Sequence, residues 1–230
     1  MKIAILGAMD EEVALLKSSL QDISTHQVQH LEVYQGTLHG HDTVLVKCGI
    51  GKVAAATATA LLIHHFAPDA VINTGSAGGF DNLLNIGDVV IGTEVTHHDV
   101  DVTHFGYKLG QAPGQPEKYQ SAPALVAAAS EAAGQIADIQ ITQGLVCTGD
   151  SFIGTDEQAE LIRHNFAGLK AAEMEAAAIA QCCHMLSVPF LIIRSLSDIA
   201  GKTSTMSFEA YLEKAAVNSA NLVMGTIQKL

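Results

Sequence analysis

The chain has 230 residues, of which 48% are hydrophobic and only 16% are charged, so it can bury a sizeable core and is not disordered. Asp and Glu outnumber Lys and Arg by 24 to 12, and the net charge of −12 leaves no basic stripe for nucleic acid. No apolar run is long enough for a signal-peptide core or a membrane span. The 4 cysteines lack CxxC spacing, which favours buried free thiols in a cytoplasmic protein.

The first half of the chain alternates short apolar runs with helical patterns. Strands are predicted over residues 2–8, 31–38, 42–48, 69–75 and 87–97. The second and third of these strands are separated by a His-Gly-His turn and are expected to form a hairpin. Helices are predicted from Asp10, where acidic residues occupy the first turn, and over residues 51–66.

The second half begins with a polar stretch rich in Gly and Pro, predicted to be a long loop over residues 106–122. Helices are predicted over residues 121–136, 156–166, 175–186 and 207–230. Strands are predicted over residues 139–149, 168–174 and 188–198. Because strands and helices alternate without a linker-like break, residues 1–230 are expected to form a single α/β domain. Its twisted mixed sheet would be flanked by helices on both faces.

Polar and glycine-rich segments follow the predicted strands, where the ligand site of an α/β sheet lies. These segments are residues 7–12, 48–52, 73–79, 148–154, 173–176 and 195–198. They contain four acids, Glu12, Glu173, Glu175 and Asp198. Each acid alone has an ordinary explanation as a helix-dipole acid, a cap or a structural pair. Four like charges at one edge raise one another's pKa values, and this concentration indicates a functional site.

Several known motifs are incomplete. GIGKVA at residues 49–54 fits the dinucleotide fingerprint, but Asp69 opens the next strand instead of closing it, so the match is weak. The same segment lacks the first glycine and the Ser or Thr of a P-loop. HHDVDVTH at residues 97–104 offers metal ligands, but neighbours on a strand point to opposite faces, so a solvated or interface segment is favoured. GxSxG is absent, so a nucleophile-elbow hydrolase lacks its serine.

Seven segments in order carry a family resemblance: GAMDEEV, CGIGKVAAA, VINTGSAGG, DVDVTHFGY, TGDSFI, AAEMEAAAIA and SLSDIA. With them the chain resembles the 5′-methylthioadenosine/S-adenosylhomocysteine nucleosidases of the nucleoside phosphorylase superfamily, over residues 1–228. The resemblance implies a nucleoside phosphorylase-like fold, a homodimer and no metal or organic cofactor. The partners that it implies are small-molecule adenine thionucleosides.

The resemblance also implies roles for individual residues. Glu12 would activate water, Asp198 would protonate adenine N7, and Glu175 would hold the ribose hydroxyls. Further substrate contacts are expected from Ala8, Met9, Ile50, Ser76, Ala77, Gly78, Phe152, Ile153, Glu173, Met174, Arg194, Ser197 and Phe208. The partner subunit would complete an apolar pocket around the 5′ substituent with its own copies of Val102, Phe105 and Pro113.

The chemistry fits these residue types. Breaking an N-glycosidic bond requires an acid for the departing purine, an anion near the cationic sugar and a base for water. Glu175, at a helix start, is expected to be compensated by free N–H groups, whereas Glu173 has either a structural or a ribose-binding role. Only two arginines occur, Arg163 and Arg194, which favours water over phosphate as the nucleophile.

The predicted reaction is therefore hydrolysis of 5′-methylthioadenosine, S-adenosylhomocysteine and 5′-deoxyadenosine, which releases adenine. A purine nucleoside phosphorylase and a futalosine-type hydrolase are the enzymatic alternatives on the same fold. A non-catalytic nucleoside-binding protein is the alternative from another class, and retention of Glu12, Glu175 and Asp198 argues against it.

Overall fold

A computed structural model of the chain describes residues 1–137, 139–200 and 204–230. Its helices are α1 (Asp10–Ser19), α2 (Lys52–Phe66), α3 (Pro123–Ala133), α4 (Asp156–Asn165), α5 (Ala176–Met185) and α6 (Ser204–Gln228), with a short 3₁₀ turn η1 (Thr103–Phe105). Its strands are β1 (Lys2–Gly7), β2 (Gln21–Val28), β3 (Leu31–Leu38), β4 (His41–Lys47), β5 (Ala70–Asn73), β6 (Ser76–Gly79), β7 (Val89–His97), β8 (Tyr119–Gln120), β9 (Ile141–Thr148), β10 (Leu169–Glu173) and β11 (Phe190–Ile199).

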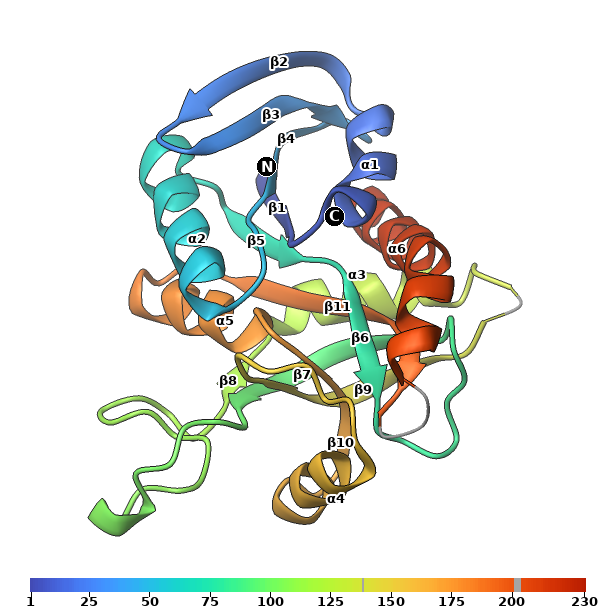
Figure 1. The fold of residues 1–230 in the computed structure, drawn as a ribbon. Coiled ribbons are helices and arrows are strands. Elements are labelled where there is room, and N and C mark those ends of the chain that lie inside the picture. Colours follow the sequence, from blue (N-terminus) through green and yellow to red (C-terminus); the bar gives the residue numbers. More distant parts are fainter. Residues whose placement is uncertain (138, 201–203) are drawn as a thin grey trace.

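Within the described residues, all eleven strands belong to one mixed sheet in the order β2-β3-β4-β1-β5-β11-β6-β10-β9-β7-β8 (Figure 1). Strand β11 also pairs with β7, so β11, β6, β10, β9 and β7 form a closed ring. The first part of β11 pairs with β5 and its last part pairs with β6. The predicted mixed α/β sheet is confirmed, and the closure of its second half was not predicted.

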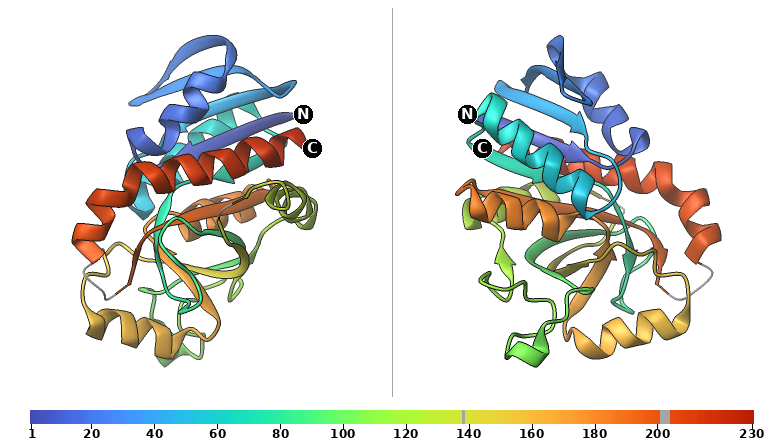
Figure 2. Two further views of the ribbon diagram at one scale, coloured as in Figure 1. Left: turned by 90° about the vertical axis from the view of Figure 1, so that its right-hand side faces the viewer. Right: turned by 60° about the vertical axis from the view of Figure 1, so that its left-hand side comes forward.

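Helices cover both faces of the open half of the sheet. Helices α1, α3 and α6 pack together on one side, and α2 packs on α5 on the other (Figure 2). Strand β1 lies between these layers, which explains its continuous apolar sequence. Its Ile3 and Ile5 belong to the core under α1, α3 and α6, whereas Ala4 and Leu6 belong to the core under α2 and α5.

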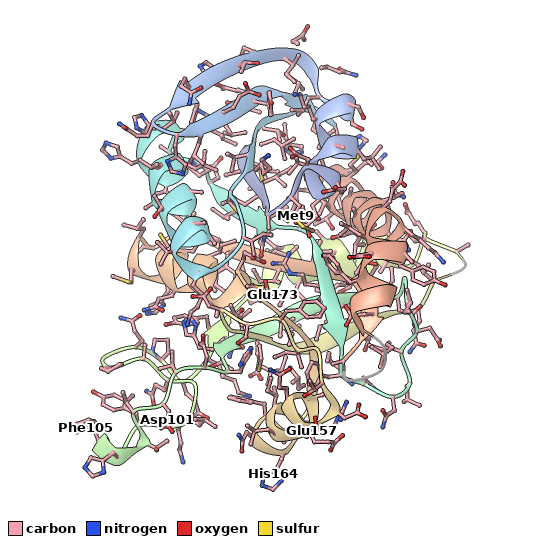
Figure 3. All side chains as sticks on the ribbon, in the orientation of Figure 1. Met9, Asp101, Phe105, Glu157, His164 and Glu173 are labelled. Atoms are coloured by element: carbon pink, nitrogen blue, oxygen red, sulfur yellow. The ribbon has the colours of Figure 1, made fainter. Side chains whose placement is uncertain are left out.

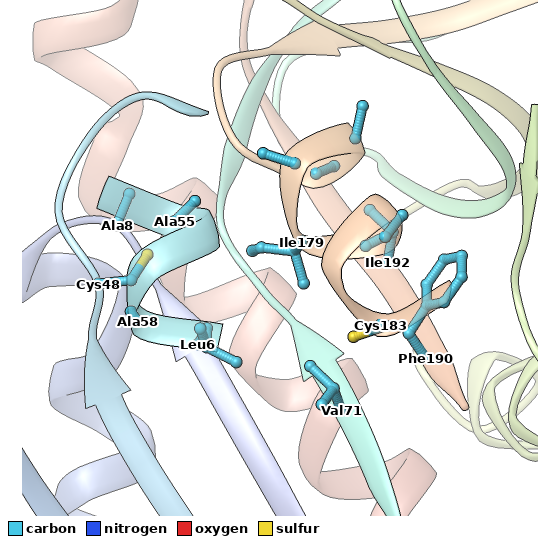
Figure 4. Close-up of a cluster of buried hydrophobic side chains, with 14 of the residues drawn as sticks. Leu6, Ala8, Cys48, Ala55, Ala58, Val71, Ile179, Cys183, Phe190 and Ile192 are labelled. Carbon is cyan, nitrogen blue, oxygen red and sulfur yellow. The ribbon is translucent and has the colours of Figure 1, made fainter. Parts of the chain in front are cut away.

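The core beneath α2 and α5 consists largely of small side chains. Figure 4 shows Ala55 and Ala58 of α2 near Ile179 and Cys183 of α5, with Leu6 of β1 close by. Alanine loses no rotamer entropy in a helix and allows close approach of the helix to the sheet. The alanines of the AAEMEAAAIA segment therefore pack the core, and its two glutamates need separate explanations.

Three strands were not predicted. Seven of the eight residues of β2 are exposed, so this edge strand carries no apolar alternation to reveal it. Strand β6 has the sequence SAGG, which reads as a loop, and β8 lies inside the predicted loop 106–122. Each of these strands is held by backbone pairing with a neighbour instead of by a hydrophobic pattern of its own.

The structure also bears on the predicted state of the cysteines and on the length of the apolar helices. Cys48, Cys147, Cys182 and Cys183 are free, as predicted. Their burial raises the pKa of each thiol, so they are poor nucleophiles at neutral pH. Among the described helices, none combines the length and apolar character needed to span a bilayer.

Candidate active site

The ends of strands β1, β4, β10 and β11 meet around one cavity of about 240 Å³, and β6 forms part of its wall. It is lined by Ala8, Met9, Glu12, Ile50, Ser76, Ala77, Gly78, Phe152, Ala172, Glu173, Met174, Glu175, Ser197, Asp198 and Phe208. Figure 3 labels two of these residues, Met9 and Glu173, near the middle of the molecule. All four acids singled out in the sequence thus line the same cavity.

Glu12 enters the cavity from the first turn of α1 and is only 3% exposed. Its Oε2 accepts from the N–H groups of Ala8 at 2.7 Å and Met9 at 3.3 Å. Its Oε1 accepts from the N–H and the hydroxyl of Ser76, at 2.8 and 2.9 Å. At Gly75 a Cβ atom would lie 2.8 Å from Glu12 Oε1, so the glycine is required for this close approach. These donors fix the position of the Glu12 carboxyl group in the cavity.

Glu173 is the last residue of β10 and is held by a dense set of donors. Its Oε2 accepts from the N–H groups of Glu175 and Ala176 at 2.9 and 2.8 Å, and its Oε1 accepts from the Thr148 hydroxyl. Arg194 Nη2 donates to Oε2 at 2.5 Å. Burial raises the pKa of the Glu173 carboxyl, but Arg194 and these donors outweigh burial, so its pKa lies below the usual value.

Glu175 stands at the N-cap position of α5, but its side chain does not cap the helix. Its Oε1 accepts from the Gly51 N–H at 2.8 Å, and Arg194 Nη2 lies 3.8 Å from its Oε2. Burial and the neighbouring Glu173 raise the pKa of Glu175 to about 8. The expectation that helix N–H groups compensate Glu175 is therefore wrong, since Glu173 takes them and Glu175 depends on the loop before α2.

Asp198 lies within β11 and is not its terminal residue, because the strand continues to Ile199. The register of β11 against β6 shifts between Leu196 and Asp198, which indicates a β-bulge. A bulge re-aims side chains, and this explains how the consecutive residues Ser197 and Asp198 both line the cavity. The Ser197 hydroxyl donates to Asp198 Oδ1 at 3.0 Å. Burial nevertheless raises the pKa of Asp198 to about 6.

The remaining wall of the cavity is apolar. Phe152, in the loop after β9, meets Phe208 of α6 edge to face, with ring centroids 5.9 Å apart and an interplanar angle of 74°. Met9 and Ile50 complete this wall. Ile50 is 57% exposed and Phe152 is 44% exposed, so this end of the cavity opens toward the surface.

Five predicted contact residues do not line the cavity of their own chain. Arg194 is 1% exposed and lies behind Glu173, where it also donates to Asn73 Oδ1 at 2.5 Å. Ile153 packs partly buried against a separate core cluster. Val102, Phe105 and Pro113 lie on the arm between β7 and β8, and Figure 3 shows Phe105 far from Met9 and Glu173. Arg194 is thus a partner of the acids in the free protein, and its predicted contact with substrate stays a prediction.

Ala172 lines the cavity but was not among the predicted residues. It is a buried alanine in β10 and carries no polar group, so nothing in its residue type could have indicated a site.

Within the described residues, no three His, Cys, Asp or Glu side chains are arranged to hold a metal ion. His97 instead donates to Gln181 Oε1 at 3.0 Å, and Asp99 pairs with Lys52 at 2.7 Å.

Comparisons with known proteins agree with this fold. Residues 2–228 match the family model of the phosphorylase superfamily. The 5′-methylthioadenosine/S-adenosylhomocysteine nucleosidase of Anoxybacillus flavithermus (strain DSM 21510 / WK1) is 54% identical over 230 residues, which cover 100% of this chain and 99% of the relative.

Two solved structures of such nucleosidases are also similar. The enzyme from Neisseria meningitidis in complex with methylthio-immucillin-A has a TM-score of 0.98 and 47% identity, covering 100% of this chain and 99% of that one. The enzyme from Colwellia psychrerythraea 34H in complex with adenine has a TM-score of 0.98 and 51% identity, covering 100% and 96%. The chain belongs to the phosphorylase superfamily and, within it, to the family of the 5′-methylthioadenosine/S-adenosylhomocysteine nucleosidases.

Proposed function

We propose that this protein hydrolyses the N-glycosidic bond of 5′-methylthioadenosine, S-adenosylhomocysteine and 5′-deoxyadenosine, and releases adenine. The observation that carries the proposal is the convergence of Glu12, Glu175 and Asp198 on one cavity with an apolar wall. Departure of adenine leaves positive charge on the ribose and places the bonding electron pair on the purine. The three carboxyl groups can meet these demands if each has its own role.

Asp198 is proposed as the general acid that transfers its proton to adenine N7 while the C1′–N9 bond breaks. An ordinary aspartate holds a proton in fewer than about one molecule in a thousand at pH 7. With its pKa raised to about 6 by burial, Asp198 holds a proton in about one molecule in ten at pH 7. The buried position of Asp198 thus makes a proton available that solution conditions would remove.

Glu12 is proposed as the base that activates the attacking water. A carboxylate offers about four lone-pair sites. In Glu12 they are filled by four donors, which are the N–H groups of Ala8 and Met9 and the N–H and hydroxyl of Ser76. A bound water must therefore replace one donor, and the Ser76 hydroxyl is the donor that can rotate. After rotation the Ser76 hydroxyl can accept a hydrogen bond from the water, while Glu12 removes the other proton of that water.

Glu175 is proposed to hold the ribose hydroxyls and to stabilise the positive sugar. In the free cavity its pKa is raised to about 8, first by burial and then by Glu173. Hydroxyl groups that donate to Glu175 favour its charged form and so lower that pKa when substrate binds. Met174 lines the cavity beside it and is proposed to pack on the sugar, and Phe152 is proposed to stack on adenine.

Water, not phosphate, is the proposed nucleophile. Arg194 is already neutralised by Glu173 and lies near Glu175, and Arg163 pairs with Glu160 on α4. Among the described residues that line the cavity, none is Arg, Lys or His, so a phosphate dianion would meet acids without a compensating cation. This arrangement disfavours the phosphorylase alternative.

The proposed reaction is tested by product analysis with 5′-methylthioadenosine, in buffer with and without inorganic phosphate. Equal rates of adenine release, with a free thioribose as the second product, support hydrolysis. A rate that requires phosphate and yields a sugar 1-phosphate would contradict it. No adenine release in either buffer, with retained binding of the nucleoside, would favour the non-catalytic alternative.

We also propose a homodimer in the cytoplasm, built from one nucleosidase domain per chain over residues 1–230. Support comes from an apolar hollow of about 660 Å³ between α2, α5 and the arm. On its rim Val53 is 78% exposed and Met185 is 64% exposed, and Phe105 of the arm is 77% exposed. Exposed apolar side chains at this density suit an interface between copies. A partner arm would then supply Val102, Phe105 and Pro113 to the open end of the cavity.

A further inference from the structure

Three segments that lie far apart in the sequence are joined beside the cavity by Lys52, Asp99 and Asp150, here called the Lys52 ring. Lys52 opens α2, Asp99 follows β7 at the start of the arm, and Asp150 follows β9. None of the three side chains lines the cavity, and none has a role in the proposed reaction. The Lys52 ring therefore requires an explanation of its own.

The Lys52 ring is closed by hydrogen bonds from both sides. Lys52 Nζ donates to Asp99 Oδ1 at 2.7 Å, and the Asp150 N–H donates to Asp99 Oδ2 at 2.9 Å. The Lys52 N–H in turn donates to Asp150 Oδ1 at 2.7 Å. Both oxygens of Asp99 are thus used, one for the first residue of α2 and one for the loop after β9.

Two of the three segments that the Lys52 ring joins reach the substrate cavity. Gly51, next to Lys52, donates its N–H to Glu175 Oε1, and Ile50 before it lines the cavity. Phe152, two residues after Asp150, also lines the cavity. The fit is close, since a Cβ atom at Gly51 would lie 3.0 Å from Asp150 Oδ1 and φ there is +94°.

Asp99 carries the negative charge that it needs to hold both of its donors in the Lys52 ring. Burial raises the pKa of the Asp99 carboxyl, but Lys52 and the Asp150 N–H together bring it below its usual value. Asp99 is thus ionised at neutral pH and holds two donors at once. The Lys52 and Asp99 side chains are 21% and 26% exposed, so solvent screens their pairing only in part.

We propose that Asp99 is a positioning residue, which through Lys52 and Asp150 fixes the two loops that present the Gly51 N–H to Glu175 and the Phe152 ring to the substrate. This inference rests on the proposed nucleosidase reaction. The same residue begins the arm that carries Val102 and Phe105, so the Lys52 ring also connects the arm to the chain's own cavity. Asp99 acts through other residues and touches no reacting atom.

A double-mutant cycle tests this proposal. Asp99→Ala and Lys52→Met should each lower kcat/KM for 5′-methylthioadenosine about tenfold, because small displacements of contacting groups reduce catalysis strongly. The double variant should lose no more than about tenfold as well, since both changes break one ring. Glu94→Gln is the matched control, because Glu94 pairs with Lys118 at 2.8 Å with similar exposure and neither residue lines the substrate cavity. That variant should stay within about twofold of the parent.

Two further readouts separate positioning from a general loss of structure. Adenosine and 5′-methylthioadenosine should lose kcat/KM by the same factor, because the two loops position Glu175 and Phe152, whose proposed contacts are the ribose and the adenine that both nucleosides share. Amide hydrogen exchange at Lys52 and Asp150 should become faster in Asp99→Ala, while exchange in the β1 core stays slow. The exchange measurement needs no activity, so it tests the Lys52 ring even if the parent releases no adenine and the proposed reaction fails.

The proposal is overturned by any of four results. The first is a parent-like kcat/KM for Asp99→Ala, and the second is a double variant whose loss equals the product of the two single losses. The third is unchanged exchange at Lys52 and Asp150 in Asp99→Ala. A loss confined to 5′-methylthioadenosine would also overturn it, because that pattern would limit the effect to the arm.

Discussion

At the scale of single residues, neighbouring acids differ because their donors differ. Glu173 has four protein donors, including a guanidinium, and its pKa is lowered. Glu175 accepts from the Gly51 N–H, and its pKa is raised to about 8. The sequence alone identified both acids and their shared site. It could not predict which of the two would accept hydrogen bonds from the N–H groups at the start of α5. That choice depends on the backbone direction after β10, which the residue types do not encode.

The raised pKa of Asp198 predicts a cost in stability. Its folded pKa of about 6 exceeds the ordinary value of 3.8, so the contribution of Asp198 to stability is fully present below pH 3.8 and is lost as pH rises through about 6. The loss amounts to about 3 kcal/mol above pH 6. Asp198→Asn should therefore unfold at higher temperature than the parent at pH 7.5 and release adenine at least about a hundredfold more slowly. A variant both less stable and fully active would contradict this assignment.

The pH dependence follows from two carboxyl groups with opposite requirements. Catalysis needs Asp198 protonated and Glu175 ionised, and their pKa values in the free protein are raised to about 6 and about 8. The product of the two required forms is nearly constant between these values and falls about tenfold per pH unit outside them. A plot of log kcat/KM against pH should thus be bell-shaped with its plateau between about 6 and about 8. A continuous rise from pH 5 to pH 9 would be incompatible with Asp198 as the acid.

At the scale of elements, the sequence predicted the helices and the longer strands correctly because their apolar patterns are strong. The missed strands β2 and β6 have no such pattern, since one is a solvated edge and the other is SAGG. The bulge in β11 was also invisible, although it explains why Ser197 and Asp198 both face the cavity. Backbone pairing with distant strands determines these features, and the local sequence carries little signal for it.

The junction of β10 and α5 depends on the buried pair of Glu173 and Arg194. Glu173→Gln removes one partner, leaves Arg194 buried without its closest counter-charge and weakens the binding of two helix N–H groups. Such a change should lower the free energy of unfolding by about 3 kcal/mol. The comparison is Glu160→Gln, which removes the exposed partner of Arg163 and should change stability by less than about 1 kcal/mol. Urea titrations of the parent and both variants provide the measurement, and similar midpoints for all three would refute this role.

At the scale of the whole molecule, the cavity is open where Ile50 and Phe152 reach the surface, and the arm of the same chain lies elsewhere. The proposed dimer resolves this geometry, because a partner arm can cover the open end. An apolar cover would favour a thioether over the hydroxyl of adenosine by a few kcal/mol at most. Substrate preference should thus depend on assembly.

Met185→Glu places a charge on the apolar hollow between α2 and α5 and should shift the protein toward monomers. The matched control is Leu161→Glu, because Leu161 is 63% exposed on α4 and Met185 is 64% exposed. Light scattering after size exclusion should give half the parent mass for Met185→Glu only. The monomer should also lose its preference for 5′-methylthioadenosine over adenosine. A parent that is itself monomeric and retains this preference would exclude the partner-supplied pocket.

The account as a whole depends on Glu12, Glu175 and Asp198 acting together in one cavity on one glycosidic bond. The most direct measurement is adenine release from 5′-methylthioadenosine in phosphate-free buffer by the parent and by Glu12→Gln, which keeps the shape of the side chain but removes the base. The parent should turn over many times, and the variant should bind the nucleoside yet react at least about a hundredfold more slowly. Equal rates for the two proteins, or no turnover by the parent, would contradict the account.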